Sequence, residues 1–228
     1  MDPTIVAAAV AFAVSYVVGA LPVAWLVVRR RHRIDMRQRG VGGTSALNAV
    51  AVGGVRTALL AGLLEVLKGA AVGLAARIYS PTGWFIATAI AGCVAGDAFP
   101  VGFRRSGRGI LPLVSGLAVA LPTAGLVTAL TAIPAAVFTS MRGRIYDAVV
   151  TIAIPAGLLL GTREWQSLAP AAVIVGILLS RAALQRRRRE ASLIRGPAWR
   201  MVIDADVPNA EPTPKTGSSI QNPQPWDS

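Results

Sequence analysis

Long apolar runs, separated by short polar segments, dominate the first 184 residues of the chain. The runs cover residues 1–28, 55–78, 84–101, 110–139, 145–161 and 168–184. A helix needs about 17 to 25 apolar residues to cross a bilayer, and the runs after the first have roughly that length, except for the longer run at 110–139. No basic residue precedes the first run, so it is predicted to be a spanning helix and not a cleavable signal peptide. The pattern predicts an all-α polytopic membrane protein.

The long run at 110–139 decides the predicted topology. Lysine and arginine gather in four patches, at residues 29–39, 104–108, 142–144 and 186–189. Short basic loops favour the cytoplasmic side, and one span at 110–139 would leave the last two patches outside. A turn at Pro122 would divide this run in two and bring all four patches inside. We therefore predict seven transmembrane helices in a bacterial cell (inner) membrane, with the N-terminus outside and the basic loops and C-terminus cytoplasmic.

The excess of positive charge does not point to nucleic acid. The chain has 23 Lys plus Arg against 11 Asp plus Glu, and 54% of its residues are hydrophobic. A nucleic-acid-binding domain would spread its cations over one face to contact phosphates, whereas here they lie between apolar runs. We expect membrane lipids as partners, no nucleic acid and no cofactor. Residues 204–228 are rich in Pro, Ser, Asn and Asp, so a disordered cytoplasmic tail is expected after a membrane domain of residues 1–203.

Cysteine and histidine, two residue types that often bind metals or act in nucleophilic catalysis, are scarce in this chain. The only cysteine, Cys93, lies within an apolar run, so a buried and unreactive thiol is expected. The only histidine, His32, lies between Arg31 and Arg33 and is expected to be a solvated member of that basic patch. A Ser-His-Asp triad or a His-rich metal site could be built only around His32, so metal-assisted chemistry is not expected.

Two polar loops remain as candidates for chemistry. Residues 40–50, GVGGTSALNAV, and residues 104–110, RRSGRGI, combine glycines with nearby arginines. Glycine lets backbone N–H groups converge on an oxyanion, and arginine binds phosphate with a bidentate fork. Both loops are expected on the same side of the membrane, so they could form one anion-binding site. The alternative is that both are plain connectors between helices.

Four motifs follow one another in a recognisable order: GVGGTSALN at 40–48, LLEVLKG at 63–69, GDAFP at 96–100 and RSGRG at 105–109. This order resembles that of the acyl-phosphate-dependent glycerol-3-phosphate acyltransferases of bacteria, the PlsY family, over roughly residues 15–196. The resemblance implies seven spans with basic loops inside. It also implies transfer of a fatty acyl group from an acyl phosphate to the primary hydroxyl of glycerol 3-phosphate. That reaction releases phosphate and lysophosphatidic acid for phospholipid biosynthesis.

The same resemblance implies which residues bind phosphate. Glu65 and Lys68 are expected to form a membrane-edge ion pair or a phosphate contact. Arg188 corresponds to a histidine of the family's last cytoplasmic motif, with a topology anchor or an anionic-lipid contact as the alternative. The other candidates for phosphate binding lie in the two glycine-containing loops, at residues 40–50 and 104–110. They are Gly40, Gly42, Asn48, Arg105, Gly107, Arg108 and Gly109.

Several polar side chains of the family pattern are missing. The replaced positions are Val41, Gly43, Leu47, Ala51, Asp97 and Ala191. Because of these losses we expect turnover to be much lower than for a protein with the full motifs. Asp97, in place of a histidine, should weaken anion binding unless Arg104 or Arg105 pairs with it. The alternatives to a divergent acyltransferase are a non-catalytic paralogue that binds anionic lipid or another lipid enzyme, and a small transporter.

Overall fold

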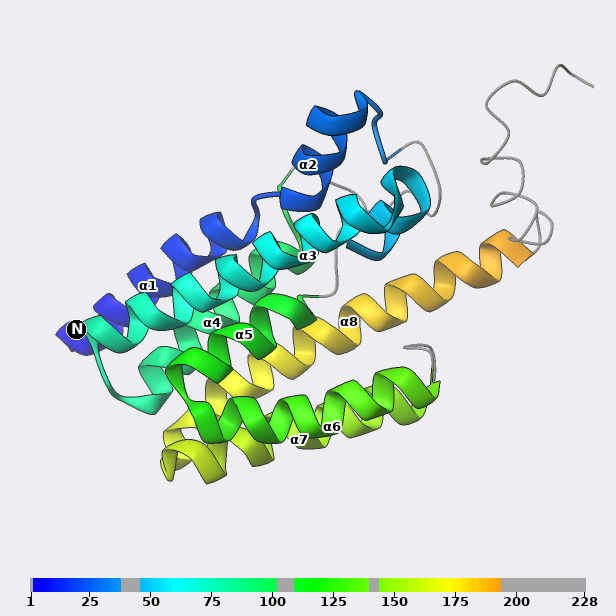
Figure 1. Cartoon of the computed structure of the whole chain (residues 1–228). Coiled ribbons are helices and arrows are strands. Elements are labelled where there is room, and N and C mark those ends of the chain that lie inside the picture. The colour runs from blue at the N-terminus through cyan, green and yellow to red at the C-terminus, as the bar shows by residue number, and fades with distance from the viewer. Residues whose placement is uncertain (1, 38–45, 102–108, 140–143, 194–228) are drawn as a thin grey trace, which may run out of the picture.

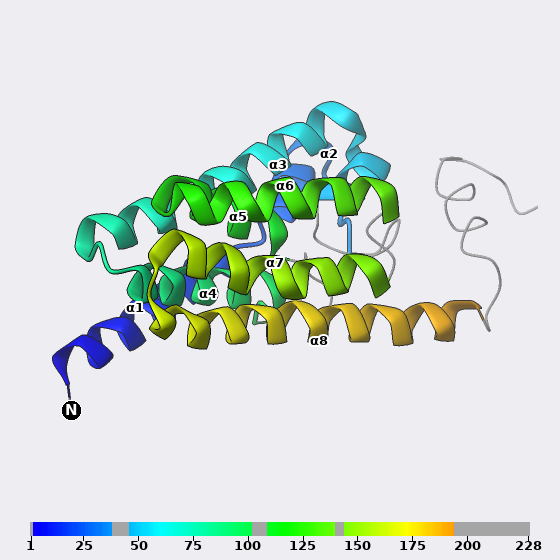
Figure 2. The same cartoon turned by 90° about the horizontal axis from the view of Figure 1, so that it is seen from below.

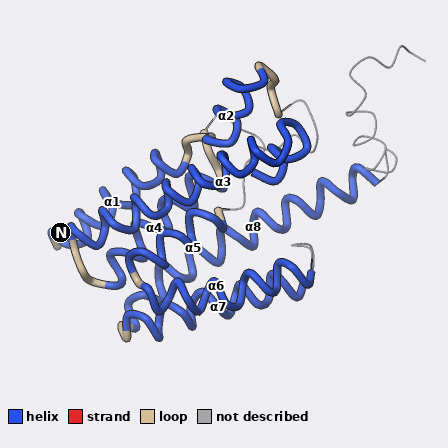
Figure 3. The backbone as a smooth tube through the Cα atoms, viewed as in Figure 1, coloured by secondary structure: helices blue, strands red, loops and turns tan. Residues whose placement is uncertain are grey.

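The structure, a computed structural model, describes residues 2–37, 46–101, 109–139 and 144–193. For residues 46–47, 132–133, 135–139, 144–147 and 185–193 it describes the backbone alone. Every element that it describes is a helix (Figure 3). The helices are α1 Pro3–Gly19, α2 Val23–His32, α3 Ala46–Tyr79, α4 Gly83–Ala98, α5 Ile110–Ala120, α6 Pro122–Thr139, α7 Arg144–Thr162, the short 3-10 helix η1 Trp165–Ser167, and α8 Leu168–Leu193. The predicted all-α class is confirmed over these residues.

Three helical segments are long and apolar enough to cross a membrane. They span Pro3–His32, Asn48–Tyr79 and Trp165–Leu184. Shorter apolar helices occupy Gly83–Ala98, Ile110–Ala120 and Ala148–Thr162. The long segments expose large apolar side chains, among them Ile5, Val17 and Leu59, as expected for helices in contact with lipid. An exposed apolar surface of this kind is stable only when lipid or another apolar partner covers it.

The long apolar run at 110–139 divides at Leu121, as the charge pattern predicted. Leu121 leaves helical geometry with φ −133° and ψ 78°, and Pro122, which lacks a backbone N–H, begins the next helix. The two helices are unequal, with 11 residues in α5 and 18 in α6. They pack closely after the turn, because a Cβ atom added at Gly125 would lie 2.3 Å from the Cα atom of Ala118. At about 1.5 Å per residue, α5 alone is too short to cross a bilayer.

The first apolar run is one candidate span, as predicted, but it is not one continuous helix. It breaks after Gly19, and α2 begins at Val23 as a separate helix. Pro22 explains the break, because a proline removes a backbone donor and its ring collides with the preceding turn. In Figure 1, α2 turns away from the line of α1 and lies beside the first part of α3, which itself kinks at Gly54 with φ 74°.

The other helices run alternately up and down the bundle. Figures 1 and 2 both place the ends of α2, α6 and α8, and the start of α3, toward one end of the molecule. The α5–α6 turn, the start of α4 and the start of α8 lie toward the opposite end. The ends of α2, α6 and α8, which adjoin three of the basic patches, thus lie toward the same end of the molecule.

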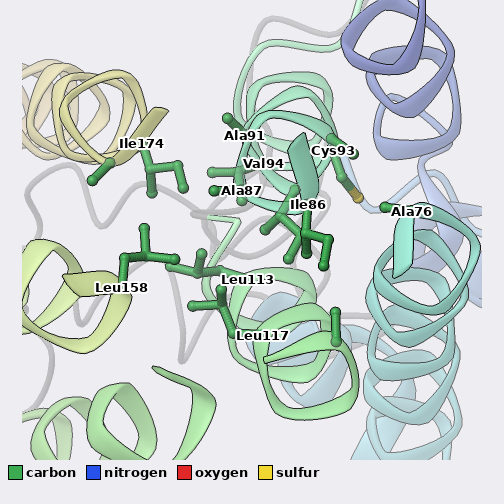
Figure 4. Packing of buried hydrophobic residues seen from close by; sticks show 14 of the residues in the cluster. Ala76, Ile86, Ala87, Ala91, Cys93, Val94, Leu113, Leu117, Leu158 and Ile174 are labelled. Carbon is green, nitrogen blue, oxygen red and sulfur yellow. The ribbon is translucent and has the colours of Figure 1, made fainter. Parts of the chain in front are cut away.

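Helix α4 forms the centre of the main hydrophobic core. Nearly all of its residues are buried, including Cys93 at 1% exposure, so the predicted burial of this thiol is confirmed. Figure 4 shows Leu113 of α5, Leu158 of α7 and Ile174 of α8 pointing toward α4. A second, smaller core joins α2 to the first part of α3 through Ala24, Val28, Met36, Ala49, Ala58 and Ala61.

Small residues bring several helix backbones into contact. A Cβ atom at Gly69 would lie 2.3 Å from the Pro112 carbonyl oxygen, and one at Gly73 would lie 2.4 Å from that of Gly116. Close packing of this kind, at glycines spaced four apart, replaces the hydrophobic effect as a source of helix association in lipid. The close approach of α3 and α5 holds the candidate residues of α3 against the start of α5.

Candidate functional site

A buried ionic cluster, formed by Glu65, Lys68 and Asp97, lies between α3 and α4. Lys68 Nζ is 2.7 Å from Glu65 Oε2 and 2.9 Å from Asp97 Oδ1. It also donates a hydrogen bond to the carbonyl oxygen of Gly19, at 3.1 Å. The three side chains are only 5%, 9% and 12% exposed for Lys68, Glu65 and Asp97. We call these three residues the Lys68 cluster.

Contacts between α1 and α4 explain how Lys68 reaches the end of α1. A Cβ atom at Gly19 would lie 2.1 Å from the Cys93 carbonyl oxygen, and one at Gly96 would lie 2.1 Å from that of Tyr16. A Cβ atom at Gly92 would lie 2.3 Å from the Phe12 carbonyl oxygen. Only glycine permits this spacing, so the two backbones lie side by side and the free carbonyl oxygen at the end of α1 faces the lysine.

Asp97 connects the Lys68 cluster to the start of α5. While its Oδ1 pairs with Lys68, its Oδ2 accepts a hydrogen bond from the backbone N–H of Gly109, at 2.9 Å. Gly109 directly precedes α5 and has a left-handed conformation, φ 72° and ψ 7°, which glycine adopts at little cost. An added Cβ would lie 2.9 Å from Val94 Cγ1, so this position has little space for a side chain.

The oxygens around Lys68 limit what this side chain can do. An ammonium has three N–H groups, and three oxygens lie within 3.1 Å of Nζ. The oxygens of Asp97 and Gly19 accept hydrogen bonds, and Glu65 pairs with the lysine by charge. A substrate phosphate could reach Lys68 only by displacing one of them. The geometry therefore favours the ion pair over the phosphate contact, the two interpretations that the sequence left open.

A buried arginine and an aromatic pair lie beside the last turn of α4. Tyr16 Oη donates a hydrogen bond to the Phe99 carbonyl oxygen at 2.7 Å, and the Arg181 guanidinium lies 5.3 Å from the centre of the Phe99 ring. Arg181 is only 6% exposed although it belongs to α8. Sequence reasoning did not select Arg181 or Asp97 as site residues. A charged residue within an apolar run is the signal that could have found both, because such residues are costly in a membrane.

A second polar cluster lies near the surface, between α2 and α3. The Trp25 indole N–H donates to Asp35 Oδ1 at 2.9 Å, and Arg37 pairs with the same carboxylate at 2.6 Å. The guanidinium groups of Arg29 and Arg37 lie 4.8 and 5.3 Å from the centre of the Trp25 ring. The Arg37 guanidinium hydrogen bonds hold the pKa of Asp35 well below its ordinary value of 3.8. We call Trp25, Asp35 and Arg37 the Trp25 cluster.

The structure separates the predicted site residues into two places. It brings Glu65 and Lys68 together and links them, through Asp97, to Gly109. Asn48 lies instead in the smaller core, where its amide donates to the Met36 carbonyl oxygen at 3.1 Å. The stretch of α3 from its kink at Gly54 to Lys68 is about 20 Å long, and Asn48 lies before that kink.

The remaining candidates lie outside the described part of the chain. Gly40, Gly42, Arg105, Gly107 and Arg108 are not described, nor is the tail at 204–228, and for Arg188 only the backbone within α8 is. Arg104 and Arg105, the partners considered for Asp97, are among the residues that are not described, and the partner observed is Lys68.

His32 is exposed as predicted but hydrogen-bonds Thr57 Oγ1 at 2.8 Å. Within the described residues, no group of three or more His, Cys, Asp and Glu could hold a metal ion.

Comparison with known proteins shows what this arrangement resembles. Residues 9–195 match the family model described as glycerol-3-phosphate acyltransferase. A glycerol-3-phosphate acyltransferase of Halalkalibacterium halodurans is 27% identical over 76% of this chain and 85% of its own. Glycerol-3-phosphate acyltransferase 5 of Dehalococcoides mccartyi is 31% identical over 67% of both chains.

Solved structures share the fold. The crystal structure of PlsY (YgiH), an integral membrane glycerol 3-phosphate acyltransferase, in its glycerol 3-phosphate form, has a TM-score of 0.65 and 21% identity, and covers 82% of this chain and 93% of the PlsY chain. The lysophosphatidic acid form gives a TM-score of 0.63 over the same shares. The family model spans the Lys68 cluster, both glycine-rich loops and the Arg188 helix. The chain belongs to the glycerol-3-phosphate acyltransferase family, of which PlsY is a structurally characterised member.

Proposed function

We propose that this protein transfers an acyl group to glycerol 3-phosphate in the membrane, as a step of phospholipid biosynthesis. One observation carries the proposal: the family match over residues 9–195 includes every motif at which the resemblance was first noted. Solved relatives of the same fold bind glycerol 3-phosphate and lysophosphatidic acid, which are the acceptor and the product of this reaction. The donor in this proposal is an acyl phosphate.

The reaction needs little chemistry from the protein. The primary hydroxyl oxygen of glycerol 3-phosphate attacks the acyl carbonyl carbon, the bond from that carbon to the phosphate oxygen breaks, and the hydroxyl proton leaves on phosphate. The donor is a mixed anhydride and is already activated. The main task is to hold two anions so that hydroxyl and carbonyl lie in reach, which backbone amides and cations can perform without a metal.

We assign the binding of the two phosphates to the glycine-rich segments and their arginines. Gly40 and Gly42 belong to the first segment, and Arg105, Gly107 and Arg108 to the second, with Arg188 on α8. We assign the buried Asn48, whose amide donates to the Met36 carbonyl oxygen, to holding the end of the first segment. We assign Lys68, with Glu65, to the framework that holds the second segment, and the three oxygens around Lys68 support this assignment. The acyl chain of the donor would remain in the bilayer, beside the exposed apolar side chains of the helices.

A non-catalytic paralogue is the second candidate function. It is favoured by Asp97, an acid at the position where the family pattern has a histidine, which lies 2.9 Å from Lys68. Such a protein would keep the fold and bind anionic lipid or another enzyme of lipid metabolism. Turnover distinguishes the two functions directly.

The test is to measure lysophosphatidic acid and phosphate release by the purified protein with an acyl phosphate and glycerol 3-phosphate. A matched variant carries Val41→Ser, Gly43→Asn and Leu47→Thr. These substitutions restore side chains of the family pattern and keep the ion pair between Asp97 and Lys68. Each restored transition-state contact is commonly worth about 10- to 1000-fold. We expect slow turnover in the unmodified protein and a faster rate in the variant. No turnover by either folded protein would contradict the acyltransferase proposal and support the non-catalytic alternative.

For the topology, we propose seven membrane helices, α1 and α3 to α8, in which α5 and α6 form a hairpin that turns at Pro122 and whose shorter leg, α5, reaches only part of the way through the bilayer. The alternating directions of the helices support this arrangement. In it the N-terminus lies outside, and the basic loops and residues 204–228 lie in the cytoplasm of a bacterial cell. Cysteines introduced at Thr82 and Gln166 should react with an impermeant reagent from outside, and one at Ser140 only after permeabilisation. Labelling of Ser140→Cys in intact cells would contradict seven spans.

A further inference from the structure

Asp97 is the described residue that joins the Lys68 cluster to the segment carrying the arginines. We propose that Asp97 is a positioning residue: with Lys68 as its counter-ion, it clamps the N-terminal end of α5 at Gly109 and so fixes the end of the segment that carries Arg105 and Arg108. This inference deepens the proposed function, because the segment it positions is the one assigned to phosphate binding. It also gives Lys68 a role in the clamp.

The placement of Asp97 shows why it needs two partners. It lies in the last turn of α4, where the partial negative charge of the helix end disfavours another negative charge. Lys68 supplies the opposite charge at 2.9 Å. The Gly109 N–H, at 2.9 Å, lies at the N-terminal end of α5, where a carboxylate is favoured by the helix dipole. The side chain thus connects an unfavourable helix end to a favourable one.

Gly109 is held from several sides, so the clamp is rigid. Its N–H donates to Asp97, and its carbonyl oxygen accepts the first backbone hydrogen bond of α5 from the Leu113 N–H, at 3.1 Å. Its left-handed φ of 72° and its packing on Val94 allow no side chain without strain. Because Gly109 is covalently joined to Arg108, a change in its position is transmitted directly to the phosphate-binding segment.

The cluster also connects this clamp to the rest of the bundle. Lys68 holds Asp97 on one side and the Gly19 carbonyl oxygen on the other. Gly19 packs against Cys93, one turn before Asp97 on α4. The lysine therefore connects α1, α3 and α4 at the point where Asp97 reaches α5. A lysine in this position acts through Asp97, since the oxygens around it leave no approach for a substrate that does not displace one of them.

The kinetic test is a double-mutant cycle on Lys68 and Asp97 with the purified, full-length protein. The variants are Asp97→Asn, Asp97→Ala, Lys68→Met and the double variant Lys68→Met with Asp97→Ala. A misplacement of about 1 Å can cost about 100-fold in rate, so we expect Asp97→Ala to raise KM for glycerol 3-phosphate and to lower kcat/KM by 10- to 100-fold. Asp97→Asn should lose less, because its amide oxygen can still accept the Gly109 N–H. The double variant should be no worse than Asp97→Ala alone.

A purely structural role of Asp97 predicts a different result. It would lower the amount of folded enzyme, and so the apparent kcat, while KM of the folded fraction stays unchanged. If Lys68 contacted a substrate phosphate, the losses from Lys68→Met and Asp97→Ala would multiply in the double variant. Either result would overturn the proposal. Asp97→Asn has nearly the shape of the native residue, so it keeps the test valid where Lys68→Met does not fold.

Hydrogen exchange tests the clamp independently of turnover. Amides at the start of α5 should exchange faster in Asp97→Ala than in the native protein. Thr88→Ala is the matched control, because Thr88 lies on α4 and its hydroxyl donates only to the Trp84 carbonyl oxygen one turn away among the bonds observed. Unchanged exchange in Asp97→Ala would refute the clamp. Faster exchange in a protein that shows no turnover would confirm the clamp while the proposed acyltransferase function fails.

Discussion

Asp97 and Asp35 make nearly the same set of contacts in opposite surroundings. Each carboxylate pairs with one cation and accepts a hydrogen bond from an N–H group of another residue: Lys68 and Gly109 for Asp97, and Arg37 and the Trp25 indole for Asp35. Asp35 also accepts a hydrogen bond from the Arg37 backbone N–H. The side chains of Lys68 and Asp97 are 5% and 12% exposed, whereas those of Arg37 and Asp35 are 42% and 23% exposed. The two clusters therefore differ in what replaces a lost partner.

Water replaces the lost partner in the Trp25 cluster but not in the Lys68 cluster. An exposed ion pair is worth about 0 to 1 kcal/mol, because solvent screens it and solvates either charge when the other is removed. A buried pair can be nearly neutral as a pair and still cost several kcal/mol when one member is removed, because the remaining charge stays out of water. The same contact list thus predicts different responses to substitution.

The largest effect should follow the loss of Lys68. Lys68→Met would leave the carboxylates of Glu65 and Asp97 buried together without their cation, and we expect a loss of about 3 to 5 kcal/mol in the free energy of unfolding. Denaturant titration in mixed micelles measures it. Arg30→Met is the matched control, since Arg30 is an exposed cation of α2 and should change stability little. Equal effects of the two substitutions would show that the burial of the cluster does not control its energetics.

The next largest effect should follow a side chain between α1 and α4. In Gly96→Ala the new Cβ would lie 2.1 Å from the Tyr16 carbonyl oxygen, so the helices must separate, at a cost of about 1 to 3 kcal/mol. The separation would also move Gly19 away from Lys68. Gly176→Ala is the matched control, because the added Cβ would meet no atom within 4 Å beyond its own neighbouring helix backbone, and the helix gains propensity. A stabilising Gly96→Ala would contradict the close packing of α1 and α4.

The sequence predicted one part of the Lys68 cluster and not the other. The pair of Glu65 and Lys68 could be predicted, because residues three apart on a helix face each other. The contact of Lys68 with Asp97 could not, because it joins positions 29 residues apart through packing of α3 on α4. The resemblance marked Asp97 only as a substitution, and the physical role of its charge required the structure.

The helix boundaries show the same limit. Charge placement predicted the break at Pro122, because an undivided helix would have put basic loops on the wrong side. No comparable charge follows Pro22 closely enough to mark a change of side, so the first run was predicted as one helix although α2 is separate. The two glycine-rich loops remain predictions, since they lie outside the described residues except for Gly109 and the residues from Ala46 onward.

A smaller effect should follow substitution in the Trp25 cluster. Asp35→Ala removes the partner of the exposed Arg37 side chain and of the half-buried Trp25 indole N–H, so the loss should be about 1 kcal/mol or less. The loss should shrink further as the salt concentration rises, because exposed charges are screened over about 8 to 10 Å at moderate ionic strength. Unfolding titrations at low and high salt measure both. A salt-independent loss as large as that of Lys68→Met would contradict the comparison.

The smallest effect is the pH dependence of the Trp25 cluster. The pKa of Asp35 is lowered in the folded protein from its ordinary value of 3.8, chiefly by the Arg37 hydrogen bonds. Above about pH 5 the carboxylate is ionised in both folded and unfolded chains, and its stabilisation is fully present. As the pH falls below the ordinary value, the unfolded chain binds a proton that the folded chain does not, so the stabilisation is lost. The difference in free energy of unfolding between the native protein and Asp35→Asn should therefore be constant from pH 7 to about pH 5 and decrease at lower pH. Unfolding titrations at several pH values measure this difference, and a difference that grows as the pH falls would show that Asp35 does not stabilise the folded chain as a carboxylate.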